Sequence, residues 1–450
     1  MGVDLERIAA GLVADRRAFH SHAESGFTEF WTASRIAGAL GEAGYDVLVG
    51  RDIMDPSSMM GLPSAEVLDA CLERAIAEGA DPATALAMRG GFTAVAGVLR
   101  NGPGPVVAFR FDIDAVDVQE SADPDHPPAR DGFASAHDGA MHACGHDGHA
   151  AIGLALARLL AEDRAEWAGT VKLVFQPAEE GVRGAKSIVE SGFLDDADFM
   201  VAGHLGVVPD GEGSFYSGVG GFLSTTKLDI RFTGRSAHAG MNPESGRNAL
   251  LAAASAALHI SGIPRHSAGA TRVNVGRIAG GSGRNVIPGE AFLALETRGE
   301  TSALNEYMAA EVARVAEGIG AAYGVSTQLS KAGEAIGAES DPGLMAIAAA
   351  CAAEAGYARV SGEPLPLGGS EDYSFMMDRV TRRGGKAVYV VFGARLADAH
   401  HARRFDFDEG AMLPAVRTLF LMARRLSRGA IAAPARFAYN RQPMRLPRIG

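Results

Sequence analysis

The sequence is poor in cysteine, in excess positive charge and in long apolar runs. Its three cysteines, Cys71, Cys144 and Cys351, are scattered over 450 residues, which argues against a disulfide framework. The net charge of -12 argues against nucleic acid or a membrane surface as partners, because both require a basic face. No segment reaches the roughly 18 consecutive apolar residues of a membrane span, and residues 1–17 lack the apolar core of a signal peptide. We therefore expect a cytoplasmic protein with reduced thiols.

The stretch 436–448 is the one local exception to the acidic balance. It contains four arginines close to Phe437 and Tyr439, and Pro443 and Pro447 interrupt it. Because its charges are too sparse for a strong basic patch, we interpret it as a solvated tail.

Short apolar runs, each ending in polar or ionisable residues, recur along the chain. Four of them are 106–111, 171–175, 199–202 and 388–392, and helical patterns separate them. Continuous apolar strands alternating with helices predict an α/β fold, with a mainly parallel sheet covered by helices on both faces. Ligands bind beyond the carboxyl ends of the strands in such sheets, and the acidic and histidine residues of this chain follow those ends.

The segment 220–334 has a different rhythm. Its strand and helix patterns follow the order βαββαβ, which is typical of a small sheet with two helices. We therefore predict a catalytic domain made of 1–219 and 335–450, with the smaller domain inserted between the two parts. A further stretch, 51–92, is rich in helix formers and predicts a helical insert in the catalytic domain.

The clearest chemical signal is Cys144-Gly145-His146. Thiol and imidazole groups two residues apart, with a glycine between them, are suited to binding a metal ion. A buried thiol beside a turn histidine is the alternative. His142, Asp147 and His149 occupy the same short stretch, where so many ionisable groups would destabilise a core without a neutralising ion. We therefore expect a metal site, with these three as supporting residues.

Other candidate groups follow the apolar runs. In Glu179-Glu180, one carboxylate can bind metal while the other acts as a base on water. His204 follows the next run, and taken alone it would more often be structural. The His400-His401 pair is a possible solvated turn, yet it is also the best source of a further ligand in the C-terminal half.

Taken together, the motifs resemble the dinuclear-metal aminoacylase and carboxypeptidase family. The resemblance runs along nearly the whole chain and rests on eight segments in order: 20–24, 109–115, 141–149, 176–181, 234–240 with Pro243, 284–288, 368–373 and the final 400–406. It implies two divalent metal ions with a water between them, and a smaller domain that acts as a lid and in dimerisation.

The resemblance also implies a role for each matching residue. Glu179 would be the general base, Asp114 would orient the ligands, and His238 would reach across a dimer to the oxyanion. Asn285 and Arg298 would bind the substrate carboxylate. The metal ligands would be Cys144, His146, Glu180, His204 and His401.

The insert 51–92 and the ending 400–409 are similar to the branch of this family that hydrolyses p-aminobenzoyl-glutamate to p-aminobenzoate and glutamate. Apolar residues of the insert would supply a wall for the aryl ring. The alternatives are an indoleacetyl-aspartate or other N-acyl amino acid hydrolase and, because Glu179 is present, less favourably an inactive metal-binding homologue. Zinc, manganese and cobalt all fit the ligand set. The partner would be a small N-acyl amino acid, and the assembly a homodimer or a heterodimer with a related second chain.

Overall fold

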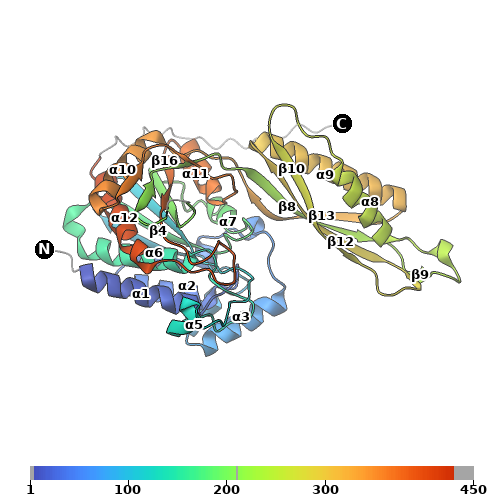
Figure 1. Ribbon diagram of the computed structural model, residues 1–450, viewed down its shortest axis with the longest axis horizontal. Helices are drawn as coiled ribbons and strands as arrows, with labels where there is room; N and C mark the ends of the chain where they lie inside the picture. Colours follow the sequence, from blue (N-terminus) through green and yellow to red (C-terminus); the bar gives the residue numbers. More distant parts are fainter. Residues whose placement is uncertain (1–4, 209–210, 430–450) are drawn as a thin grey trace.

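The computed structural model describes residues 5–208 and 211–429 and has a large α/β part with a smaller part projecting from it (Figure 1). The basic stretch 436–448 lies outside the described residues. Within them, no helix is both long and apolar enough to span a membrane.

The large sheet has eight strands in the order β1-β2-β4-β3-β5-β16-β6-β14. Its centre, β4-β3-β5-β16, is parallel, whereas β1, β2 and β6 pair antiparallel toward the edges. The predicted mainly parallel α/β sheet is therefore confirmed. The strands are β1 (Asp46–Val49), β2 (Val95–Asn101), β3 (Val106–Asp112), β4 (Gly169–Gln176), β5 (Phe199–Leu205), β6 (Ser214–Tyr216), β14 (Arg359–Ser361) and β16 (Lys386–Phe392).

Helices cover both faces of this sheet, because successive residues of each buried strand point to opposite sides. Phe109 and Leu173 belong to the core under one layer of helices, whereas Ala108 and Val174 belong to the core under the other. The first layer contains α1 (Leu5–Ser21), α2 (Phe30–Glu42), α6 (His146–Glu162), α10 (Pro342–Ala355) and α12 (Met412–Ser427). The second contains α7 (Ala185–Glu190) and α11 (Tyr373–Arg382).

The predicted helical insert contains two helices, α3 (Ala65–Ala77) and α4 (Pro82–Ala87). Ser64 and Asp81 cap them by accepting hydrogen bonds from Val67 and Thr84, and this explains where each helix begins. The short helix α5 (Pro127–Asp131) and the two-stranded pair β7 (Val219–Gly220) with β15 (Leu365–Pro366) complete the large part.

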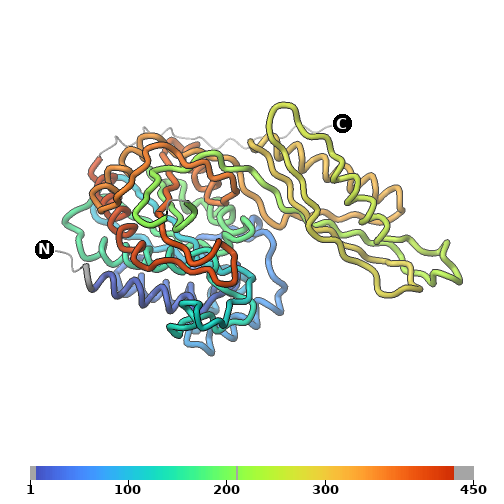
Figure 2. Tube along the Cα trace, in the orientation of Figure 1, coloured from blue at the N-terminus to red at the C-terminus, as the bar shows by residue number. Residues whose placement is uncertain are grey.

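The smaller part is an antiparallel sheet with two helices on one face and its own apolar core. Its strand order is β10-β12-β8-β13, and its chain order is the predicted βαββαβ. Figure 2 shows the chain leaving the large part, forming this layer and returning. The elements are β8 (Ser224–Thr233), α8 (Ala249–Ser261), β10 (Thr271–Gly280), β12 (Glu290–Gly299), α9 (Ser302–Tyr323) and β13 (Ser326–Ala335), with a small β9 (Ala237–His238) and β11 (Val286–Ile287) pair. The domain boundaries at 219/220 and 334/335 stay a prediction.

Candidate metal centre and active site

The ionisable residues of the sequence motifs meet at the carboxyl edge of the parallel strands. Asp112 ends β3, Glu179 and Glu180 follow β4, His204 lies near the end of β5, and His401 follows β16. Because β4, β3, β5 and β16 run parallel as neighbours, their ends deliver these side chains to one place.

Cys144 and His146 reach the same place from the start of α6. Gly145 precedes the helix with φ 92°, a left-handed conformation that glycine adopts without steric cost. This turn puts His146 at the first helical position and leaves Cys144 just before it. The local sequence therefore determines that these two side chains are neighbours.

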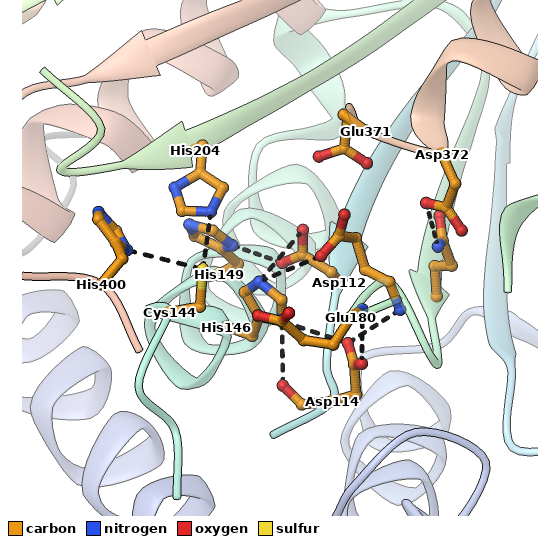
Figure 3. A network of polar contacts seen from close by, with 12 residues as sticks. Asp112, Asp114, Cys144, His146, His149, Glu180, His204, Glu371, Asp372 and His400 are labelled. Carbon is orange, nitrogen blue, oxygen red and sulfur yellow. Dashed lines mark hydrogen bonds and ion pairs between the residues drawn. The ribbon is translucent and has the colours of Figure 1, made fainter. Parts of the chain in front are cut away.

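Three overlapping groups of possible ligand atoms lie here, each with its members within 4.8 Å of one another. The groups share Cys144, His146 and Glu180, so they form one continuous cluster. Together they bring all five predicted ligands and Glu179 into one site: Cys144-His146-His204, Cys144-Glu180-His401 and His146-Glu179-Glu180. In Figure 3, dashed lines join Cys144 to His204 and to His400.

The imidazoles of the cluster are oriented as metal ligands require. His146 Nδ1 donates toward Asp114, with 2.9 Å to the backbone oxygen and 3.2 Å to Oδ1. Its Nε2 therefore carries a lone pair, and this buried atom has no hydrogen-bond partner among the described residues. His204 Nδ1 likewise donates to the Leu205 oxygen at 2.8 Å, leaving Nε2 facing Cys144 Sγ at 3.5 Å. A metal ion would satisfy these lone pairs, so the residues present fit such an ion.

Asp114 holds the neighbouring backbone as well as the histidine. Its two carboxylate oxygens accept hydrogen bonds from the backbone N–H groups of Glu179, at 3.1 Å, and Glu180, at 2.9 Å. One buried carboxylate thus connects the loop after β3, the loop after β4 and the start of α6 (Figure 3).

Burial and neighbouring charges shift the titration of the cluster. Burial, together with the charges of Glu371 and Glu180, raises the pKa of Glu179 well above its usual range. Burial raises the pKa of Cys144 to about 12, so this thiol needs a cation beside it to act as a thiolate ligand. The hydrogen bond to Glu180 raises the pKa of His401, against the effects of burial and of the nearby Lys227 charge.

The three expected supporting residues surround the cluster. Asp147 accepts from Arg16 Nε and His20 Nδ1, both at 2.8 Å, and so ties α6 to α1. His149 contacts Asp112 through Nδ1 at 2.5 Å and accepts from the Leu205 N–H through Nε2. His142 is buried, and neither of its ring nitrogens has a partner within the described chain.

Several residues at the site were not assigned a role from the sequence. Glu371 and Asp372 form a further acidic group with Glu179, and Arg110 pairs with both of them at 3.1 and 3.3 Å. His400, the first histidine of its pair, lies 3.6 Å from Cys144 Sγ. The adjacent acids of the segment 368–373 were a usable signal, but nothing local distinguishes His400 from His401.

A cavity of about 350 Å³ opens beside the cluster, a size typical of small-molecule sites. Val182, Val207 and Leu367 form its apolar side. None of the described residues that line it comes from 51–92, so the insert does not supply the expected aryl wall. Gly61 of the insert instead packs against Ala332 of β13.

The smaller part contributes to this cavity through its sheet. Thr225 and Lys227 of β8 and Arg298 of β12 line the side of the cavity that belongs to the smaller part. His238 and Asn285 lie elsewhere, at the β9–β11 pair near the far tip of the molecule (Figure 1). Within one chain, the structure therefore brings Arg298 to the site and leaves these two residues away from it.

Residues 108–425 match the model of the peptidase family M20/M25/M40. Over 411 residues the chain is 47% identical to the indole-3-acetyl-aspartic acid hydrolase of Enterobacter agglomerans, covering 91% of this chain and 94% of that protein. Over 407 residues it is 46% identical to one of the polypeptides of p-aminobenzoyl-glutamate hydrolase from Escherichia coli (strain K12), with 90% and 93% covered.

Solved structures agree with these similarities. The aminobenzoyl-glutamate utilization protein from Klebsiella pneumoniae superposes with a TM-score of 0.80 at 40% identity, covering 94% of this chain and 97% of that one. The YXEP protein of Bacillus subtilis, a dinuclear metal-binding peptidase of the M20 family, has a TM-score of 0.64 at 25% identity over 94% and 99% of the two chains.

Proposed function

The chain belongs to the peptidase family M20/M25/M40, and within this family of metal-dependent hydrolases we propose that it cleaves the amide bond of N-aroyl or N-acyl acidic amino acids. The proposed substrate is p-aminobenzoyl-glutamate, and the products are p-aminobenzoate and glutamate. The observation that carries this proposal is the single cavity that joins the metal-ligand cluster, Glu179 and the cationic Arg298. The similarity to the E. coli hydrolase supports the choice of substrate.

We propose that Cys144, His146, Glu180, His204 and His401 hold two divalent ions. The thiol favours zinc, while the imidazole and carboxylate ligands would also accept manganese or cobalt. When bound, the ions would supply Lewis acidity that polarises the scissile carbonyl and makes a water molecule a stronger nucleophile.

Glu179 is the proposed base because it lies beside the ligands without being one of the five. Its carboxylate takes a proton from the attacking water and delivers it to the amide nitrogen as the C–N bond breaks. Asp114 positions Glu179 through the backbone hydrogen bond and keeps the His146 lone pair directed at the cluster. The cluster is partly shielded from solvent, since the Glu179 side chain is only 13% exposed.

Arg298 is the proposed partner of the substrate α-carboxylate, for which its planar guanidinium is well suited. Asn285 and His238 would complete the site from a second chain, because within their own chain they lie at the far tip (Figure 1). The assembly would then be a homodimer or a pair with a related second chain.

A second candidate substrate, indoleacetyl-aspartate, is favoured by the similarity to the Enterobacter enzyme. The two substrates share an aromatic acyl group and an acidic amino acid, so the same cavity would accept both.

The test is a turnover comparison of p-aminobenzoyl-glutamate, indoleacetyl-aspartate and hippurate, with metal analysis of the same sample. We expect p-aminobenzoyl-glutamate to have the highest kcat/KM and hippurate, which lacks a second carboxylate, the lowest. Failure to cleave any member of a broad panel of acyl and aroyl amino acids, with both metal positions occupied, would refute the enzymatic function.

A further inference from the structure

Two permanent cations, Lys227 and Arg298, are among the described residues that line the cavity. They lie on adjacent antiparallel strands, where Thr225 is opposite Arg298 and Lys227 is opposite Glu296. Residues directly opposite each other share a face of the sheet, and diagonal neighbours are roughly 7–8 Å apart. Lys227 and Arg298 are such diagonal neighbours, so their charges are spaced to contact two groups of one small molecule.

The two cations differ in how they are neutralised. Arg298 donates through Nε and Nη2 to the two oxygens of Glu296, at 3.0 and 3.2 Å. Glu296 is opposite Lys227, but both its oxygens are engaged by the arginine. Lys227 has no hydrogen bond or ion pair with any described residue, although it is half-buried in the cavity lining. A partly desolvated ammonium without a counter-charge is unfavourable until an anion binds.

The opposite face of the sheet excludes a packing role for this lysine. Leu228 and Ile230 point to the helices α8 and α9 and belong to their apolar core. Because side chains alternate along a strand, Lys227 points away from that core, on the same side as Thr225. Its neighbours in space are therefore the cavity and the substrate it holds.

We propose that Lys227 determines the preference for acidic amino acids by pairing with the side-chain carboxylate of the substrate. This inference rests on the proposed function and adds a second anchor to it. An N-aroyl glutamate carries two carboxylates, and if Arg298 contacts the α-carboxylate, Lys227 is the unneutralised cation that remains for the other. Charge-assisted pairs of this kind discriminate strongly against a neutral analogue, because the cation is then left unpaired in the cavity.

The test compares p-aminobenzoyl-glutamate with p-aminobenzoyl-glutamine, which has the same shape but no side-chain charge. Lys227→Met should lower kcat/KM for the glutamate conjugate about 10- to 100-fold, mainly through KM, and change the value for the glutamine conjugate little. Lys227→Arg should retain most of the preference. Arg231→Met is the matched control, since Arg231 is an exposed cation on the same face of β8 outside the cavity lining and should leave both values unchanged.

Thermal unfolding of each variant checks the fold, and Lys227→Gln repeats the test if Lys227→Met does not fold. An equal loss on both substrates, or an unchanged ratio between them, would overturn the role of Lys227 while leaving the amidohydrolase function in place. Failure of the proposed function gives a different result, because the metal-loaded wild type would then cleave neither substrate and both conclusions would fall.

Discussion

Replacing Glu179 with glutamine separates catalysis from metal binding at this site. Glutamine keeps the size of the side chain and the backbone hydrogen bond to Asp114, but it cannot take a proton from water. General acid–base groups typically contribute about 10²- to 10⁴-fold to the rate. Because the Glu179 side chain is only 13% exposed, bulk water has little access to replace it, and we expect the upper part of this range. A loss of 10⁴-fold corresponds to about 5 kcal/mol of transition-state stabilisation.

The assay measures kcat on p-aminobenzoyl-glutamate and metal content on the same Glu179→Gln sample. Metal content should stay near two ions per chain, because the five proposed ligands are untouched. The control is Glu180→Gln, which changes the adjacent residue, a member with Cys144 and His401 of one ligand group. That variant should lose metal as well as activity.

Two results would refute this reasoning. A Glu179→Gln enzyme with nearly normal kcat would show that another group accepts the proton, and Glu371 would be the next candidate because it lies in the same acidic group. Loss of metal from Glu179→Gln with retention by Glu180→Gln would mean that the two adjacent glutamates have the opposite roles.

The other predictions concern stability, assembly and pH. Arg16→Met should lower the free energy of unfolding by about 3–5 kcal/mol in urea titrations, since it strands buried acids; the exposed Arg89→Met should change it by less than about 1 kcal/mol. His238→Ala should be folded but inactive, and mixing it with Glu179→Gln should restore some turnover; verified mixed dimers without activity would exclude action in trans. Burial raises the pKa of Glu24 to about 7, so its folded form holds its proton more tightly and stability falls as pH rises from about 4.5 to 7. Between pH 5 and 8, Glu24→Gln should therefore gain about 2 kcal/mol relative to wild type, and a constant difference would contradict this.

The sequence alone was enough to predict the central strands and the composition of the smaller layer. The apolar runs at 106–111, 171–175 and 388–392 correspond to β3, β4 and β16, because buried parallel strands need continuous apolar residues. The antiparallel edges were not predicted. β6 and β14 have three residues each and pair with strands distant in sequence, so no local pattern indicates them.

The candidate site divides in the same way. Local sequence determines that Cys144 and His146 are neighbours, because Gly145 allows the left-handed turn at the start of α6. It also places Glu179 and Glu180 together after a strand. The different surroundings of these two glutamates depend on Asp114 and Glu371, which are brought to them from other strands.

The sequence by itself determined which chemical groups the protein carries and in what order, since ligand types and strand periodicity are local properties. Only the tertiary structure decided which of them share a cavity. The insert 51–92 was the predicted wall for an aryl ring, yet it packs against the smaller part outside the lining. Lys227 is an ordinary strand residue in the sequence and becomes a cavity cation because β8 pairs with β12 in one register. Pairing between distant strands sets that register, so no local pattern reveals the charge.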